Sequence, residues 1–320
     1  MAFLTFLIRR LLLGIIVMWF VTVATFLLFF VAPQDPARLL AGKNPTPQTI
    51  AAINARLGLN QPLIVQYGHY VDRLVHGNLG TSFVNGSSVN TILKQDLPPT
   101  LSLLVGGVIL WLIVGLGAGI LSATRVRTLV DRTSTVGVLI GITFPTFVLG
   151  LLLQFAIFLP LNRSGFHWVQ TGYEGPTTSI VGWAGHMILP WITIAAVSAA
   201  TYTRLTRGSL LDTMGEDYIR TARSKGLTER RVLYRHAIRA ALTPVVSQLG
   251  VDMGTLAGGA VVTEQVFGLG GIGQQSLTSI TTGDTPVVLG IVLMAALFVV
   301  VANIVVDVLY SVLDPRVKLS

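Results

Sequence analysis

The chain has 320 residues, of which 52% are hydrophobic and only 11% are charged, and its mean hydropathy is +0.72. Because soluble globular domains carry about 25% charged residues, this composition excludes a water-soluble globular protein. The chain contains no cysteine, which excludes disulfides, thiolate metal sites and cysteine nucleophiles.

Six charge-poor segments are long enough, or nearly so, to cross a membrane as helices. A hydrocarbon core about 30 Å thick requires roughly 20 apolar residues in a helix, and no segment has the alternating pattern of a transmembrane β-strand. We therefore predict an all-α polytopic membrane protein. The predicted spans are Leu11–Val31, Leu101–Ala123, Thr133–Pro160, Met187–Thr203, Val245–Phe267 and Pro286–Val306.

The formal net charge of +8 is mainly a signal of membrane topology. Most of the 22 basic residues precede the first span, separate the second from the third, lie between Arg204 and Arg239, or follow the sixth. Basic residues in short loops stay on the cytosolic side. We therefore expect both termini and the 204–244 loop in the cytosol, and we expect no nucleic-acid binding.

Residues 32–98 form the one sizeable soluble segment, which the topology places on the outer side. Apolar residues at helical spacing predict helices over Pro47–Leu57 and Pro62–Val75, and Gly77 to Gly80 should end the second. The segment is too small for an independent domain, so we expect it to pack on the outer helix ends as a cap or docking surface.

The sequence offers no site for catalysis, ATP hydrolysis or metal binding. It lacks the phosphate-binding pattern G-x-x-x-x-G-K-[ST], and its five histidines show no i, i+4 pair. Gly268-x-Gly270-x-x-Gly273 matches a dinucleotide fingerprint in form only, because it follows a predicted span rather than a strand. We interpret it as a flexible outer turn, and we expect water at the membrane interface to solvate the nearby Glu264.

Unusual residues mark the third and fifth spans. Pro145 predicts a kink in the third. In the fifth, Gly250, Gly254 and Gly258 share one face and allow close approach of another helix, either of this chain or of a partner subunit. Asp252 lies about two turns into the same helix. A charge there is costly and indicates a role in a transport path or between helices.

The most informative segment is the basic loop between the fourth and fifth spans, residues 216–244, which we call the elbow. Tyr218, Ile219 and Ala222 share one face of a predicted short helix, and its basic residues lie largely on other faces. Gly226 predicts a left-handed end to that helix.

A second helix should follow at once and connect the elbow to the fifth span. Thr228 is placed to cap it, and Pro244 is placed to end it. Such an elbow would present a rigid surface to a partner protein. An amphipathic helix lying on anionic lipid has the same pattern, so that alternative stays open.

Several motifs extend in a familiar order and spacing from the outer segment to the C-terminus. They are Leu57-Gly58-Leu59-Asn60-Gln61-Pro62, Gln66-Tyr67, Gly77-Asn78-Leu79-Gly80, Phe144-Pro145-Thr146-Phe147, Thr221-Ala222-Arg223-Ser224-Lys225-Gly226-Leu227, Arg235-His236-Ala237-Ile238-Arg239, Gly258-Gly259-Ala260-Val261-Val262 and Asp314-Pro315-Arg316. Together they resemble permease subunits of peptide-type ATP-binding-cassette (ABC) importers, in the dipeptide, oligopeptide and nickel branch. The likeness covers essentially the whole chain and is closest to the first of the two permease subunits. The chain departs from the family pattern at Gln34, Asn60 and Asn78, on the binding-protein side.

The resemblance implies a type I ABC importer fold with six spans and a machine of several subunits. Its partners would be a second homologous permease, two ATPase subunits that bind ATP and Mg, and an extracytoplasmic substrate-binding protein, in the bacterial plasma membrane. The chain itself would hold no catalytic residue and no cofactor. The elbow would be the coupling helix, and the implied ATPase contact is Arg220, Thr221, Ala222, Arg223, Lys225, Gly226, Leu227 and Arg230. The residues expected at the pore or in helix packing are Gly250, Asp252, Gly254 and Gly258.

The implied function is import of short peptides by alternating access. Nickel chelates, glutathione-like peptides or another small cofactor remain alternative substrates. A secondary transporter would need inverted repeats with broken helices in both halves, whereas the sequence shows one kinked span and no repeat. A membrane enzyme would need clustered ionisable residues at membrane depth, and no such cluster is present.

Overall fold

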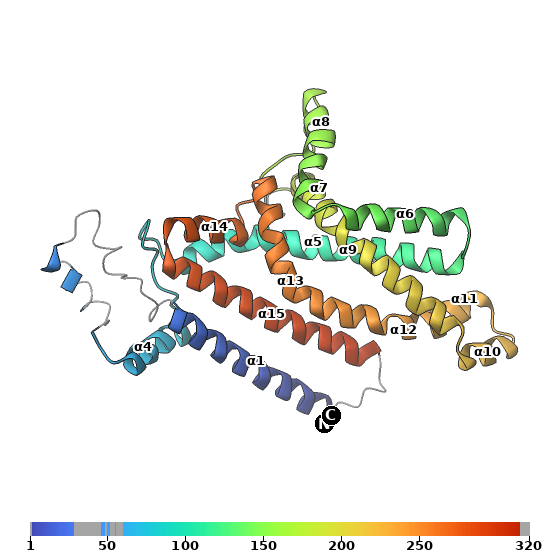
Figure 1. The fold of residues 1–320 in the computed structure, drawn as a ribbon, viewed down its shortest axis with the longest axis horizontal. Coiled ribbons are helices and arrows are strands. Elements are labelled where there is room, and N and C mark those ends of the chain that lie inside the picture. The colour runs from blue at the N-terminus through green and yellow to red at the C-terminus, as the bar shows by residue number, and fades with distance from the viewer. Residues whose placement is uncertain (1, 29–45, 49, 52–54, 56–59, 314–320) are drawn as a thin grey trace. The chain divides into compact units, whose positions relative to one another are not determined.

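The computed structural model describes the chain except for residues 1, 29–45, 49, 52–54, 56–59 and 314–320 (Figure 1). Apart from one isolated antiparallel bridge between Thr81 and Ser88, its regular structure is helical. The elements are α1 (Ala2–Phe26), α4 (Leu63–Val75), α5 (Val89–Thr124), α6 (Leu129–Thr143), α7 (Thr146–Leu153), the π-helical η2 (Gln154–Phe158), α8 (Leu159–Arg163), α9 (Ile180–Met214), α10 (Asp217–Ser224), α11 (Glu229–Arg231), the π-helical η3 (Val232–Ala237), α12 (Ile238–Ala241), α13 (Thr243–Phe267), α14 (Ile272–Thr282) and α15 (Thr285–Leu313).

Among the residues that the structure describes, five stretches of helix are long and apolar enough to span a membrane. They are Thr5–Phe26, Val89–Thr124, Thr146–Arg163, Ile180–Met214 and Thr285–Tyr310. A sixth candidate consists of Glu229–Leu256 and Ala260–Phe267, which meet at 56°. The prediction of an all-α polytopic membrane protein is confirmed, and its fifth span is bent.

The third predicted span, Thr133–Pro160, is wrong as a single helix. α6 ends before Phe144, which is extended with φ −95° and ψ 131°, and α7 begins after Pro145. Proline disfavours a helical conformation at the residue before it and has no N–H to donate, so the expected kink is a complete break. The spanning segment is instead Thr146–Arg163, and it contains the π-helical turn η2.

The outer segment 32–98 agrees with the prediction in part. α4 begins after Pro62 and ends before His76, as predicted. Gly77 and Gly80, with φ of 71° and 94°, then turn the chain. The predicted helix Pro47–Leu57 lies largely outside the described residues. The last part of this segment is helical, because α5 begins at Val89 and continues through Pro98 and Pro99 without ending.

The chain forms two compact units. Unit 1 comprises Met1–Phe6, Leu97–Gln274 and Val301–Ser320, and unit 2 comprises Leu7–Asp96 and Gln275–Val300. In unit 1, α9 contacts α6, α7, α12 and α13. In its most apolar stretch 44% of the residues are buried, against 6% in the first span, so α9 is the core helix of this unit.

Glycines let α5 and α6 approach α9 closely. A Cβ added at Gly115 of α5 would lie 2.6 Å from Cβ of Tyr202, and one added at Gly119 would lie 2.6 Å from Cβ of Thr206. On α6, a Cβ at Gly141 would lie 2.6 Å from a carbonyl oxygen of α9. Since the hydrophobic effect does not drive helices together within lipid, such close packing is a principal source of stability.

An ion pair between the buried Asp131 and the partly exposed Arg207 joins the start of α6 to α9. Nε and Nη2 of Arg207 donate to the two carboxylate oxygens of Asp131 at 2.8 and 3.0 Å. The hydroxyl of Ser122 and the backbone N–H of Arg127 donate to the same carboxylate. These hydrogen bonds hold the pKa of Asp131 well below its usual range, and those from Arg207 have the largest effect. The pair therefore fixes the α5–α6 turn against α9.

Unit 2 packs α1, α4 and α15 around a small aromatic core. Phe26, Tyr70 and Leu293 are buried together, and the hydroxyl of Tyr70 lies 3.3 Å from that of Thr25. The turn after α4 is held by Asp284, which is 4% exposed and accepts a hydrogen bond from the N–H of Phe83 at 2.9 Å. The outer segment is thus attached to α1 and α15 by both apolar and polar contacts.

We expect Gly115→Ala to destabilise the protein by about 1–3 kcal/mol, because the added methyl group overpacks the α5–α9 contact. Gly117 is the matched control, since a Cβ there would meet nothing within 4 Å and alanine is the better helix former. Thermal unfolding of the two purified variants in detergent measures the difference. Equal midpoints would contradict close packing at Gly115.

We expect Asp131→Asn to lower the unfolding midpoint by several degrees, because it leaves the partly buried Arg207 guanidinium without its counter-ion. The pKa of Asp131 is lowered by folding, so its contribution to stability is present above the ordinary carboxyl pKa of about 4 and is lost as the pH falls below it. The difference between wild type and variant should therefore be constant from pH 6 to 8 and shrink in strong acid. Asp72→Asn is the control, since that side chain is 70% exposed; an equal shift in both variants would exclude a special role for the pair.

Candidate functional site

The elbow has a packed core of its own. The buried residues of this core are Leu210, Ile219, Ala222, Val232, Ala237 and Ala241, and Leu227 packs against them. Ile219 is fully buried and Ala222 is 7% exposed, as their shared face predicted. Tyr218 does not lie with them, because its side chain is 45% exposed. The core attaches α10 to the end of α9 and to the helix that leads into α13.

The turn at Gly226 fixes the angle of the elbow. Gly226 has φ 78°, as the predicted left-handed helix end requires. Its N–H donates to the carbonyl of Arg223 at 2.9 Å, and the N–H of Leu227 donates to the carbonyl of Ala222 at 3.4 Å. This pair of bonds, with Leu227 packed on the core that contains Ala222, is a Schellman motif. A Cβ at Gly226 would meet nothing within 4 Å, so only the backbone conformation demands glycine there.

The second helix of the elbow continues into the fifth span. Thr228 occupies its N-cap position, but its side chain makes no capping hydrogen bond. The prediction that Pro244 ends this helix is wrong. Pro244 lies in the first turn of α13. Glu229–Leu256 consequently runs as one helical stretch with the π-helical η3 inside it. A displacement of the elbow would reach the membrane span without passing through a loop.

An ion pair across the turn adds to this rigidity. Nε of Arg223 donates to Oε1 of Glu229 at 2.8 Å and Nη2 donates to Oε2 at 3.3 Å. Both side chains are largely in water, so the pair adds little to stability, but its two bonds restrict the angle between α10 and α11. Sequence reasoning missed Glu229, because a spacing of six residues across a turn follows no helical rule.

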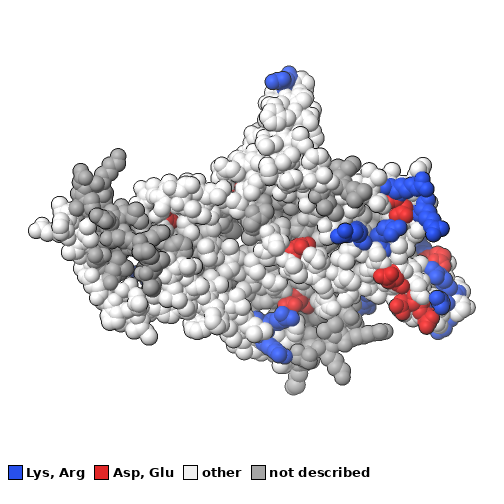
Figure 2. Space-filling model, in the orientation of Figure 1, with Lys and Arg blue, Asp and Glu red and all other residues white. Residues whose placement is uncertain are grey.

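The outward face of the elbow is basic and carries two tyrosines. The exposed residues include Arg220, Thr221, Arg223, Lys225, Gly226 and Arg230. Tyr218 and Tyr234 are 45% and 63% exposed. Figure 2 shows many of the charged side chains, basic and acidic, at the end of unit 1 formed by α10, α11 and the α5–α6 turn. Exposed tyrosine and arginine on a rigid frame are typical of a protein-binding surface. The sequence analysis did not recognise that Tyr218 and Tyr234 are both exposed on this face.

Asp252 lies where α13 meets α9. The hydroxyl of Tyr202 donates to one carboxylate oxygen at 2.8 Å, and the side-chain amide of Gln248 donates to the other at 2.9 Å. Gln248 stands four residues before Asp252, a spacing that could have been recognised in the sequence. The carboxylate is therefore held by α9 and by its own helix.

The predicted glycine face of α13 does not have one environment. A Cβ at Gly250 would lie 3.2 Å from Val306 of α15, so this glycine packs within the chain. Gly254 is exposed, and a Cβ there would meet nothing within 4 Å. Gly258 is helical, but its surroundings lie outside the described residues.

The glycine-rich turn between α13 and α14 encloses Glu264, and the expectation that water solvates Glu264 is wrong. Glu264 is fully buried. It accepts hydrogen bonds from the hydroxyl of Thr100 at 2.6 Å and from the N–H of Gln274 at 3.0 Å. Added Cβ atoms at Gly271 and Gly273 would lie 2.5 and 2.9 Å from its carboxyl group. These two glycines make room for a buried carboxylate.

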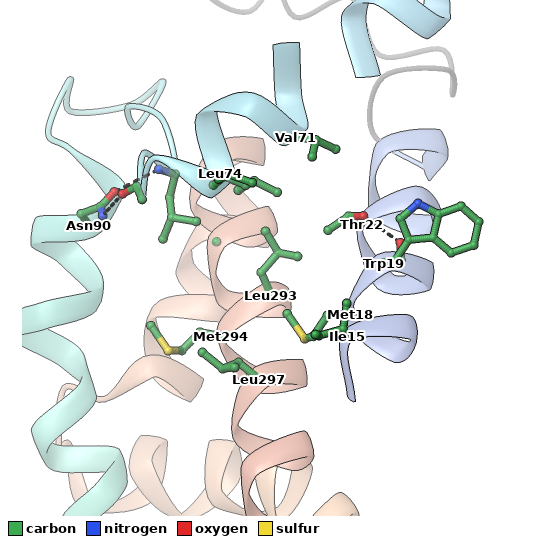
Figure 3. A pocket seen from close by; sticks show the side chains of 14 residues that line it. Ile15, Met18, Trp19, Thr22, Val71, Leu74, Asn90, Leu293, Met294 and Leu297 are labelled. Atoms are coloured by element: carbon green, nitrogen blue, oxygen red, sulfur yellow. Dashed lines mark hydrogen bonds between the residues drawn. The ribbon is translucent and has the colours of Figure 1, made fainter. Parts of the chain in front are cut away.

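Unit 2 contains a separate, apolar pocket of about 490 Å³ between α1, α4 and α15 (Figure 3). Leu293, Met294 and Leu297 of α15 line one side, and Ile15 and Met18 of α1 line another. No ionisable side chain lines it within the described part of the chain. Its chemistry differs from that around Asp252, where a charge lies inside the membrane-spanning part.

Comparisons with known proteins cover nearly the whole chain. A family model described as binding-protein-dependent transport system inner membrane component matches residues 115–319, and one described as the N-terminal part of such a component matches residues 3–104. A probable peptide ABC transporter permease protein, y4tP of Sinorhizobium fredii, is 36% identical over 314 residues, which are 98% of this chain and 99% of the relative.

Two further relatives are the glutathione transport system permease proteins GsiC of Escherichia coli O6:H1 and Salmonella choleraesuis. They are 38% and 37% identical over 315 residues, again 98% of this chain and 99% of each relative. The model of the inner membrane component covers more than half of the chain, and these relatives match it nearly end to end. The chain therefore belongs to the family of binding-protein-dependent transport system inner membrane components, the permease subunits of ABC importers with the type I fold.

Proposed function

We propose that this chain imports short peptides across the bacterial plasma membrane as one of two permease subunits of an ABC importer. The observation that carries the proposal is the elbow, a rigid basic surface continuous with a spanning helix. The named relatives, a probable peptide permease and glutathione permeases, favour a peptide or glutathione-like substrate. Nickel chelates and other small cofactors are the alternatives.

The proposed partners would supply ATP hydrolysis and substrate delivery. It has no phosphate-binding motif, so two separate ATPase subunits would bind ATP and Mg, and this subunit would hold no cofactor. An extracytoplasmic binding protein would deliver the substrate to the side of residues 32–98. Both termini and the elbow would lie in the cytosol, as the distribution of basic residues favours.

The proposed coupling contact uses the exposed face of the elbow. Arg220, Lys225 and Arg230 would meet the ATPase together with the two exposed tyrosines. Ala222 and Leu227 would support the contact surface without touching the ATPase, because they pack in the elbow core. Arg223 would hold the angle through Glu229. When the ATPase subunits close on ATP, the elbow would move and carry α13 with it, which reopens the path toward the binding protein.

The direct test is purification of this chain with the products of neighbouring genes, followed by reconstitution in proteoliposomes. We expect a second permease and two ATPase subunits to co-purify, and ATP hydrolysis to rise when binding protein and short peptides are added. Isolation of the chain without any ATPase would overturn the proposal and reopen the secondary-transporter alternative. If a nickel chelate stimulated ATP hydrolysis and peptides did not, the chain would still be an importer permease, but its substrate would be the chelate.

We expect Gly226→Val to uncouple ATP hydrolysis from transport. A left-handed backbone costs a non-glycine residue about 1–2 kcal/mol, so the elbow would lose its angle while the spans stay folded. Gly226→Asn is the control, because asparagine tolerates this conformation. Peptide uptake per ATP hydrolysed should fall severalfold in the valine variant and stay near wild type in the asparagine variant. Equal coupling in both would remove the role assigned to this turn.

A further inference from the structure

A small polar cavity in unit 1 lies beside Asp252. Its volume is about 210 Å³, and α5, α7, α9 and α13 all contribute to its walls. The residues that line it are Trp111, Thr146, Ile194, Val197, Ser198, Thr201, Asp252, Thr255 and Leu256. Four of them carry hydroxyl groups and one carries a carboxylate. This composition is unusual for a hollow among membrane-spanning helices, where apolar linings predominate.

Two hydrogen bonds orient the carboxylate of Asp252. Its two hydrogen-bond donors in the described part of the chain, the hydroxyl of Tyr202 and the side-chain amide of Gln248, are uncharged. No basic side chain forms an ion pair with it among the side chains that the structure describes. Charged groups inside a membrane protein are ordinarily paired or face a functional path. A cation in the cavity would supply the missing partner.

Neutral groups around the carboxylate suit the rest of a peptide. The indole N–H of Trp111 is buried without a hydrogen-bond acceptor among the described residues, and Trp111 is one of the residues that line the cavity. The hydroxyls of Ser198 and Thr201, one helical turn apart on α9, line it as well. Donors of this kind pair with carbonyl oxygens, while the carboxylate pairs with an ammonium group.

The cavity also adjoins an open face of the same helix. Ser247, Val251, Gly254 and Thr255 of α13 are exposed. Three of them, Ser247, Gly254 and Thr255, are small or polar and Val251 is apolar, whereas the exposed face of α1 carries larger apolar residues such as Ile15 and Phe20. A face of the first kind is suited to water or to a partner subunit, and less to lipid. A ligand could therefore reach Asp252 from the α13 side.

We propose that this cavity is a binding site for the protonated amino group of the transported substrate, with Asp252 as its counter-ion. The proposal rests on the proposed import of peptides for the identity of the ligand, but the preference for a cation is a separate property of the site. It makes Asp252 a selectivity residue of the permease itself.

The absence of cysteine from the chain permits a direct test. Ser198→Cys places one thiol on the wall of the cavity, and Ser87→Cys places one at an exposed turn in unit 2 as the control. The whole importer in lipid is treated with a methanethiosulfonate reagent that carries trimethylammonium and, separately, with one that carries sulfonate. The mass shift of this chain gives the two labelling rates without interference from partner subunits.

We expect the ratio of cationic to anionic labelling at Ser198→Cys to exceed that at Ser87→Cys by about tenfold or more, because a partly buried charge acts strongly at short range. Adding Asp252→Asn should return the ratio to the control value, and Asp252→Glu should preserve it. The ratio is first measured with Asp252 unchanged, so a variant that fails to fold does not prevent the test. Equal ratios at the two cysteines would overturn the proposal.

The ligand is tested by protection. A tripeptide with a free amino group should slow labelling at Ser198→Cys severalfold, and its N-acetylated form should not. Equal protection by both peptides, or no protection in an importer that transports the tripeptide, would overturn recognition of the ammonium group. If the importer transports no peptide, the peptide function fails, while the reagent ratio still decides whether the site prefers a cation.

Discussion

The close packing of α5 and α6 on α9 is the constraint on which unit 1 depends. Lipid tails are as apolar as leucine, so helices inside a membrane gain stability from contact geometry and polar pairs more than from burial. Gly115, Gly119 and Gly141 supply the contact geometry, because each removes a side chain exactly where a neighbouring backbone or Cβ would collide. The Arg207–Asp131 pair supplies the polar contact at the end of the same interface. Because α9 is fixed in this way, it gives rigid support to both the elbow and the Asp252 cavity, to which it contributes residues.

The elbow and the cavity are connected through one helix. Glu229–Leu256 carries the elbow core at one end and Asp252 near the other. In the proposed function, motion of the elbow would therefore change the surroundings of Asp252 directly. The hydroxyl of Tyr202 comes from α9, so a shift of α13 along α9 would alter one of the two hydrogen bonds that orient the carboxylate.

Much of the architecture could be predicted from local pattern. The apolar segments predicted most of the spans. Gly226 predicted the end of α10 and Pro62 predicted the start of α4, because a helix end depends on a few neighbouring residues. The break at Pro145 was foreseen as a kink only, since sequence does not tell whether neighbouring helices support a bent helix or a broken one. The start of α5 was misplaced, because Pro98 and Pro99 read locally as helix breakers, yet the helix contains both.

The site was predicted less completely, for a physical reason. Asp252 was recognised because a charge among apolar residues is visible in the sequence, but its partner Tyr202 lies 50 residues away. The burial of Glu264 depends on Thr100, which is 164 residues away. Long-range polar contacts of this kind leave no periodic signal. The elbow was easier to predict, since its turn, core and ion pair lie within one short stretch.

The Arg207–Asp131 pair has a consequence for biogenesis. Asp131 precedes Arg207 by 76 residues, so a ribosome completes the α5–α6 turn long before it makes the guanidinium. Until α9 emerges, the carboxylate has only the Ser122 hydroxyl and the Arg127 amide as partners. The nascent hairpin is therefore held less firmly than the finished one, and the arrival of α9 is the step at which unit 1 can lock into its native arrangement.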